Sequence, residues 1–143
     1  MNLDPTWIAA AKTAQDQTGI PSSVSLAQFG LESGWGQHMP PGSNNPFGIK
    51  AFHGGGVSSP TTEVINGKVI HESQPFAIYP NLNIAFLAHA LLLTHNPVYQ
   101  SAIAALPDVT KFVTLMAQHY ATDPGYAQKI LGIIHIGNLT QYD

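Results

Sequence analysis

The pattern of apolar and polar residues predicts helices at both ends of the chain, separated by a loop and a β-hairpin. A first helix is expected to begin at Asp4-Pro5, where aspartate acts as N-cap and proline takes the first helical position, and to end near Gln17. A second helix follows, and either Ser22 or Ser23 is its candidate N-cap.

The middle of the chain departs from helical spacing. Residues 36–60 contain many Gly, Pro, Ser and Asn and are typical of an extended loop. The segment T-T-E-V-I-N-G-K-V-I-H-E at 61–72 has two β-prone runs around Asn66-Gly67, which indicates a hairpin. From about Leu82 the pattern is helical again, with breaks near residues 96–97, 107 and 123–124. The sequence therefore predicts one α+β domain over residues 1–143, mainly α-helical, with a small hairpin lobe after the second helix.

The second helix carries an unexpected carboxylate. At 100° per residue, apolar side chains cover most of the helix and leave a narrow polar stripe of Ser25, Gln28 and Glu32. A helix this apolar is expected to be buried on most sides, so the stripe should line a cleft or an internal hydrogen-bond network. Desolvation there tends to raise a carboxyl pKa, which suits a general acid. On the helix alone, an internal pairing or an ordinary solvent face is the favoured explanation of Glu32.

The predicted hairpin offers a second carboxylate. A two-residue turn at Asn66-Gly67 places Glu63 and Glu72 on one face as diagonal neighbours. Glycosidic hydrolysis commonly uses one carboxyl group as acid and another as base, nucleophile or electrostatic stabiliser. A helix-borne Glu32 opposite a hairpin carboxylate fits that chemistry, whereas a solvated hairpin with surface charges fits the same spacing.

The composition narrows the classes of function. Apolar residues make up 44% of the chain and charged residues 9%, which favours a compact fold. The formal charge of −3 argues against nucleic-acid binding. The chain has no cysteine, so disulfides, thiolate nucleophiles and cysteine-ligated zinc are excluded. The start lacks the features of a secretory signal, and the longest apolar run, at 84–93, is too short to span a bilayer. We therefore expect synthesis in the cytoplasm and no stable membrane insertion.

Five segments stand in a recognisable order. They are S-L-A-Q-F-G-L-E-S-G-W-G at 25–36, S-N-N-P-F-G-I-K-A at 43–51, T-T-E-V-I-N-G at 61–67, F-A-I-Y at 76–79 and Y-A-T-D-P-G-Y-A at 120–127. Together they resemble the glucosaminidase domain of glycoside hydrolase family 73, particularly the type fused to flagellar rod-assembly proteins. The resemblance implies a lysozyme-like fold and cleavage of the β-1,4 bond after N-acetylglucosamine in peptidoglycan.

The resemblance also implies roles by position. Glu32 matches the catalytic acid at the end of the family's central helix. Glu63 matches the second carboxylate, which acts as a base on water or orients the substrate's N-acetyl group. Tyr120 matches a tyrosine that lines the cleft near the acid, although its helical spacing also makes the ring part of the core. The loop at the cleft floor is matched by Asn45, Phe47 and Gly48.

Aromatic residues near these motifs are candidates for stacking on sugar faces, and packing is the alternative for each: Trp35, Phe52 and Tyr79. Three positions depart from residues frequent in the family. Ala77 stands where arginine is common and Pro46 where leucine is, and Phe52 lies in the neighbourhood where a tryptophan is common. These departures affect the substrate-binding subsites and leave both proposed catalytic carboxylates in place.

The seven histidines form no metal-binding pattern. His89 and His95 lie six residues apart and do not share a helix face, and His71-Glu72 lies on a strand. His38 and His53 flank the loop without a ligand set, and His89 is expected to be a satisfied core residue. We therefore expect a hydrolase that needs neither metal nor cofactor, which weighs against zinc- or cysteine-dependent amidases and endopeptidases.

The leading hypothesis is an endo-β-N-acetylglucosaminidase with Glu32 as general acid. The alternatives are a muramidase or lytic transglycosylase on the same fold, a non-catalytic glycan-binding module, and an assembly protein with an inactive hydrolase fold. Peptidoglycan strands are the expected partner, and a monomer is the expected state. A standalone catalytic domain suggests a phage endolysin released by a holin, or an effector delivered by a secretion apparatus, acting on the cell wall in the periplasm or outside the cell.

Overall fold

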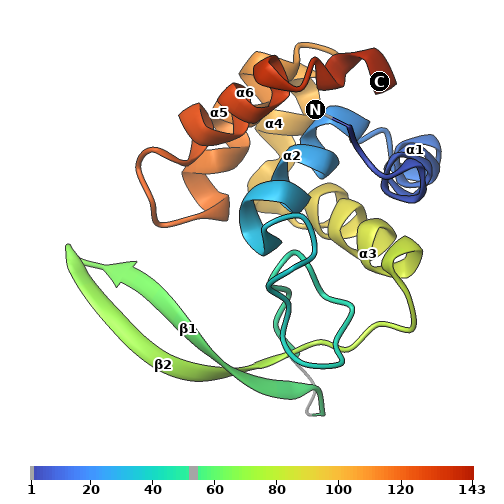
Figure 1. The fold of residues 1–143 in the computed structure, drawn as a ribbon. Helices are drawn as coiled ribbons and strands as arrows, with labels where there is room; N and C mark the ends of the chain where they lie inside the picture. Colours follow the sequence, from blue (N-terminus) through green and yellow to red (C-terminus); the bar gives the residue numbers. More distant parts are fainter. Residues whose placement is uncertain (1, 52–54) are drawn as a thin grey trace.

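The computed structural model describes residues 2–51 and 55–143, apart from the side chain of Glu63. The six helices of this part are α1 (Pro5–Thr18), α2 (Ser22–Ser33), α3 (Leu82–His95), α4 (Gln100–Ala105), α5 (Val109–Tyr120) and α6 (Tyr126–Ile136). Two short 3₁₀ helices are η1 (Pro97–Tyr99) and η2 (Leu139–Tyr142), and two strands are β1 (Val57–Ile65) and β2 (Lys68–Phe76). Figure 1 shows the helices gathered into one body, from which the strand pair extends as an arm. This confirms the predicted α+β class with a hairpin after the second helix.

The ends of the first two helices test the predicted caps. Asp4 is the N-cap of α1, as expected, because its side chain accepts from the backbone N–H of Thr6 at 2.8 Å. The prediction for α2 was wrong, since Pro21 is its N-cap and Ser22 and Ser23 are its first two residues. Side chains outside the helix bind their N–H groups instead: Gln15 of α1 accepts from Ser22, and Asp143 at the other end of the sequence accepts from Ser23.

Helix α2 is the centre of the fold. Every residue from Ser22 to Gly30 is buried, and α1, α3, α6 and η2 all pack against it. The helix emerges from this surround only in its last turn, where Glu32 is exposed. In the described part of the chain, no helix combines the length and the apolarity needed to cross a membrane.

The hairpin has the register that Asn66-Gly67 predicts. Ile65 pairs with Lys68, and the antiparallel ladder continues to Val57 and Phe76. Strand β1 thus begins inside the segment expected to be a loop. The base of the hairpin is joined to the preceding loop, because the Ala51 N–H donates to the Pro75 carbonyl at 2.9 Å. At the tip, the Val64 N–H donates to Thr122 Oγ1 at 3.4 Å, so the arm returns to the segment between α5 and α6.

The turn after α2 depends on a close approach between a tryptophan and a glycine. Gly34, Trp35 and Gly36 all have positive φ, which reverses the chain and lays the Trp35 ring against the helix that it has just left. The ring stacks on Trp7 with centroids 6.0 Å apart. A Cβ at Gly30 would lie 2.5 Å from a ring atom of Trp35, which leaves no space for any larger residue.

Gly30 is therefore predicted to be required despite its place inside a helix. Gly30→Ala should lower the free energy of unfolding by about 1–3 kcal/mol, because the rigid Trp35 ring must move. Gly132 is the matched control, since it lies in α6 and a Cβ there meets nothing within 4 Å. Gly132→Ala should raise stability by up to about 1 kcal/mol. Urea unfolding of both variants measures this, and a stabilised Gly30→Ala protein would contradict the packing described.

Candidate active site

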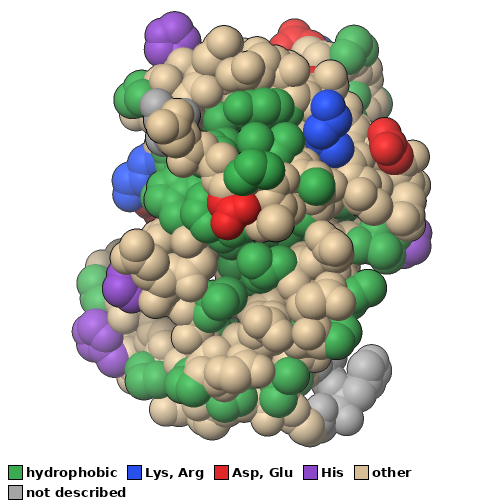
Figure 2. All heavy atoms as spheres, turned by 45° about the vertical axis from the view of Figure 1, so that its right-hand side comes forward, with side chains coloured by type: hydrophobic (Ala, Val, Ile, Leu, Met, Phe, Trp, Pro, Cys, Tyr) green, Lys and Arg blue, Asp and Glu red, His purple; other side chains and the backbone are tan. Residues whose placement is uncertain are grey.

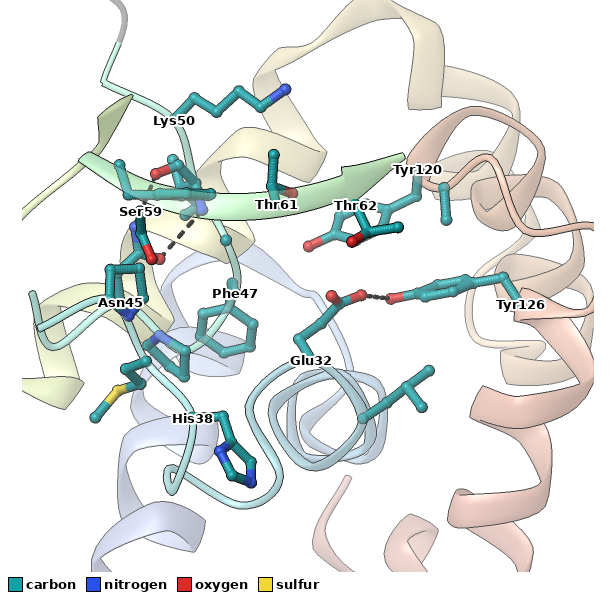
Figure 3. Close-up of a pocket in the computed structure, with 18 of the residues that line it drawn as sticks. Glu32, His38, Asn45, Phe47, Lys50, Ser59, Thr61, Thr62, Tyr120 and Tyr126 are labelled. Carbon is teal, nitrogen blue, oxygen red and sulfur yellow. Dashed lines mark hydrogen bonds between the residues drawn. The ribbon is translucent and has the colours of Figure 1, made fainter. Parts of the chain in front are cut away.

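A cleft of about 970 Å³ runs between the helical body and the hairpin. Its lining comes from the end of α2, the loop at 37–50, strand β1 and the segment around residues 120–129. Figure 3 shows Glu32 on one side of this cleft and Thr61 and Thr62 of β1 across from it. Hydrophobic side chains gather on the face shown in Figure 2, where charged ones are few and scattered.

The structure brings five of the sequence-predicted residues to this cleft: Glu32, Asn45, Phe47, Gly48 and Tyr120. Trp35 and Tyr79 lie outside its described lining, and their rings are half-buried against other parts of the protein. Glu63 lies on β1 opposite Ile70, and its side chain is outside the described part. Phe52 and His53 lie outside the described residues.

Glu32 stands where the buried helix meets solvent. It lies in the last turn of α2 and is exposed, yet its Oε1 accepts a hydrogen bond of 2.7 Å from the Tyr126 hydroxyl. The predicted polar stripe therefore has two parts. Ser25 and Gln28 are buried inside the body, and Glu32 reaches the cleft.

A chain of buried polar groups leads from the core to Glu32. The Nε2 atom of His89 lies 2.8 Å from Gln28 Oε1, and Gln28 Nε2 donates to the Tyr126 hydroxyl at 2.9 Å. His89 and Gln28 are fully buried, and Tyr126 is 4% exposed. His89 is thus a core residue, as expected, but it is not fully satisfied, since its buried Nδ1 has no partner among the described residues. Desolvation lowers its pKa to about 3.

Tyr126 was missed by the sequence analysis. It is the second tyrosine of Y-A-T-D-P-G-Y-A, and the Glu32 contact comes from 94 residues away in the chain. The ring begins α6, and its hydroxyl points back across the helices to the end of α2 (Figure 3). A signal was present in the motif, but no local spacing separates this tyrosine from one that only packs.

Tyr120 combines packing with a position beside the acid. Its ring stacks on Tyr126 with centroids 5.6 Å apart and meets His89 edge-on at 6.0 Å. The hydroxyl points into the cleft above the Glu32 carboxyl group (Figure 3). Burial raises the pKa of Tyr120 well above its ordinary value, and the nearby Glu32 charge raises it further. The phenol is therefore a neutral hydrogen-bonding group at physiological pH.

Asn45 holds the cleft floor together from inside. Its side-chain amide donates to the carbonyls of Ile49 and Ala77 at 2.7 and 3.0 Å, while its Oδ1 accepts from the Ile49 N–H at 3.1 Å. The residue is 1% exposed. These bonds fix the loop that carries Phe47 and Gly48, so Asn45 shapes the floor through the backbone.

The aromatic candidates have different positions: one supports the cleft floor, one packs elsewhere, and one is bonded to the floor loop. Phe47 is 4% exposed and stacks on His89 with centroids 4.1 Å apart, so it supports the floor from beneath. Trp35 packs on Trp7 and Phe29. Tyr79 is tied to the floor loop by its backbone, because its N–H donates to the Ser43 carbonyl at 2.8 Å.

The cleft has a second described carboxylate, Asp123, with a different environment. Lys129 binds it, and this hydrogen bond, together with one from the Gly125 N–H, holds the pKa of Asp123 below its usual value. Glu72 of the hairpin is exposed, accepts from Gln74 and is not part of the described lining. Among the described side chains, no three of His, Asp or Glu come together as a metal-binding group. Glu32 lies in the same cleft and accepts from the Tyr126 hydroxyl, and a carboxyl group at this position is able to transfer a proton to a bound substrate.

Comparisons with known proteins agree with this geometry. The glucosaminidase family model, described as mannosyl-glycoprotein endo-β-N-acetylglucosaminidase, matches residues 8–139. The peptidoglycan hydrolase FlgJ of Salmonella typhimurium is 36% identical over 132 residues, which cover 87% of this chain and 42% of the relative. A probable N-acetylmuramidase of Lactococcus lactis subsp. cremoris is 35% identical over 147 residues, which cover 94% of this chain and 33% of the relative. The chain thus spans less than half the length of these relatives.

Solved structures share the whole fold. A peptidoglycan hydrolase mutant from Sphingomonas sp. A1 superposes with a TM-score of 0.82 at 31% identity, covering 94% of this chain and 92% of that one. The catalytic domain of the autolysin Auto from Listeria monocytogenes gives 0.79 at 29% identity, covering 97% and 86%.

Buried His89 predicts a specific loss of stability in acid. Its pKa is about 3 in the folded protein and 6.5 in the unfolded chain, so between these values only the unfolded chain takes up the proton. Stability should therefore fall as the pH falls from 6.5 toward 3, by at most about 1.4 kcal/mol per pH unit from this residue. In His89→Gln the slope should decrease, as measured by urea unfolding at successive pH values. His135→Gln, which removes an exposed imidazole, is the control, and an equal change in both variants would contradict the assignment.

Proposed function

Because the chain belongs to the glucosaminidase family of glycoside hydrolases, we propose that it cuts the glycan strands of peptidoglycan as an endo-β-N-acetylglucosaminidase with Glu32 as general acid. The observation that carries this proposal is the placement of Glu32 at the cleft, held at one oxygen by Tyr126. The relative named FlgJ is a peptidoglycan hydrolase, which supports the choice of polymer.

In the proposed reaction, the β-1,4 linkage lies in the cleft beside Glu32. The protonated carboxyl group gives its proton to the departing glycosidic oxygen while positive charge develops on the sugar ring that remains. Tyr120, neutral at the pH of the reaction, offers a hydroxyl beside this group. Glu63 of β1 is assigned the second role, either as base on the attacking water or as the group that orients the N-acetyl side chain.

A muramidase is the second candidate, because relatives from Lactococcus lactis are named probable N-acetylmuramidases. A muramidase would use the same cleft and the same acid on the alternate bond of the strand. The proposal also includes action on the cell wall in the periplasm or outside the cell, as a monomeric single domain over residues 1–143. An endolysin released by a holin, or an effector of a secretion apparatus, is the setting that we propose.

The first test removes the acid while keeping its shape. Glu32→Gln retains an oxygen that accepts from Tyr126, so the fold should be kept while digestion of purified sacculi falls by at least about 100-fold. Asp16→Asn, an equal change on an exposed position of α1, should leave digestion unchanged. Turbidity loss measures both. Undiminished digestion by Glu32→Gln would refute the role of Glu32, and wild-type protein that binds sacculi without cutting them would indicate a glycan-binding module.

The second test identifies the bond and the hairpin carboxylate. Digested sacculi are reduced with borohydride and the new ends identified by mass spectrometry, and reduced N-acetylglucosamine is the expected end. Reduced muramic acid would indicate a muramidase, and anhydromuramic acid a lytic transglycosylase. Glu63→Gln should lower the rate by about 100-fold or more, whereas Glu72→Gln on the same hairpin should keep it. Full activity of Glu63→Gln would favour a mechanism with one carboxylate.

A further inference from the structure

We propose that Tyr126 is a positioning residue for Glu32, and that Gln28 and His89 fix the direction in which its hydroxyl donates. This inference rests on the proposed role of Glu32 as general acid. Its consequence is that the transferable proton of Glu32 is held on Oε2, because Oε1 is the acceptor of the Tyr126 hydroxyl.

Three helices meet in the chain of contacts. His89 is on α3, Gln28 on α2 and Tyr126 on α6, and the successive distances are 2.8, 2.9 and 2.7 Å as far as Glu32. The groups before Glu32 are buried. The His89–Gln28 and Gln28–Tyr126 links therefore form where water does not compete, so their direction is set by the protein alone, and only the last link reaches the exposed Glu32.

The donor and acceptor roles in this hydrogen-bond network follow from His89, the residue farthest from Glu32. His89 Nδ1 is buried without a hydrogen-bond partner among the described residues. A buried N–H without an acceptor costs more than a buried lone pair without a donor, so the imidazole proton belongs on Nε2. His89 Nε2–H then donates to Gln28 Oε1, and the Gln28 amide N–H donates to the Tyr126 oxygen. The Sδ atom of Met116, 3.9 Å from Gln28 Nε2, favours the same amide orientation.

This sequence of donors and acceptors fixes where the Tyr126 hydroxyl directs its proton. Its oxygen already accepts from Gln28, so its one proton is directed at Glu32 Oε1. A carboxyl group that accepts at Oε1 keeps its own proton on Oε2, and the contact limits its rotation. After the proton leaves, the same bond stabilises the carboxylate. Because burial keeps the His89 pKa near 3, the imidazole stays neutral and the direction holds over the working pH range.

The alternative is that Tyr126 only fills space in the core. Its ring does pack there, against Tyr120, and its helix α6 packs against α2. The two readings differ in what the hydroxyl does, because packing belongs to the ring. Tyr126→Phe separates them, since it removes the oxygen and keeps the ring. The other described titratable groups along the cleft remain in place in this variant: Tyr99, Tyr120, Lys50, His38, Asp123 and Lys129.

The experiment follows the Glu32 carboxyl carbon by ¹³C NMR during a pH titration, alongside the pH profile of sacculus digestion. In Tyr126→Phe, loss of a donor to the carboxylate should move the Glu32 titration midpoint upward by about 1 pH unit. The alkaline limb of kcat/KM should move with it, because the acid must be protonated to act. The kcat should fall about tenfold with little change in KM, since the contact orients the acid and does not bind sugar.

Two further variants sharpen the result. Gln28→Met keeps the side-chain length but cannot donate to Tyr126, and should shift the midpoint in the same direction by a smaller amount. Tyr142→Phe removes the hydroxyl of a half-buried tyrosine outside the described cleft lining and should shift nothing. An unchanged midpoint in Tyr126→Phe would overturn the proposal, and a wild-type midpoint in Gln28→Met would overturn the part assigned to Gln28 and His89.

The outcome is separable from that of the proposed function. If Glu32→Gln digests sacculi normally, the proposed function fails, yet the NMR titration still reports whether Tyr126 donates to Glu32. A shifted midpoint with unchanged kcat in Tyr126→Phe would overturn the positioning role while leaving the contact. A lower melting temperature alone, without a midpoint shift, would identify Tyr126 as a packing residue.

Discussion

One buried amide fixes how three helices meet. Gln28 lies in the centre of α2 and is fully buried, so its polar atoms need partners within the protein. It finds them on His89 of α3 and Tyr126 of α6, and any shift of either helix would break a bond that water cannot replace. The position of Glu32, one turn further along α2, follows from this constraint. The carboxyl group of Glu32 is thus exposed to solvent, while the helix that carries it is fixed by buried hydrogen bonds.

The opposite side of the cleft, formed by the floor loop and the hairpin, is held by hydrogen bonds to the backbone. Asn45 binds the carbonyls of Ile49 and Ala77 and so ties the floor loop to the chain leaving the hairpin. Lys50 and Phe76 form an isolated bridge at the same place. Floor and hairpin are therefore joined through the backbone, whereas Glu32, Tyr120 and Tyr126 belong to the helical body. The floor also packs on that body, because Phe47 stacks on His89.

Local chemistry in the sequence predicted local structure well. Asn66-Gly67 gave the hairpin register, and Asp4-Pro5 gave the start of α1, because a turn or a cap depends on neighbouring residues. The cap of α2 could not be predicted in this way, since Asp143, 120 residues away, accepts from Ser23 in its first turn. The same limit applies to Tyr126, whose bonds to Gln28 and Glu32 join residues 98 and 94 positions apart. Trp35 was a candidate for either sugar stacking or packing, and its place against Gly30 depends on the positive φ of its turn, which the spacing of residues does not reveal.

The two ends of the hairpin are attached with unequal strength. At its base, backbone bonds of 2.9 Å join Ala51 to Pro75 and Ala77 to Ile49, whereas at its tip the Val64–Thr122 contact is 3.4 Å long and exposed to water. The tip contact is therefore the weaker of the two attachments. Loss of that one contact would open the cleft along this side. The glycan strand proposed as substrate would then enter laterally, without a free end being threaded past Val64 and Thr122.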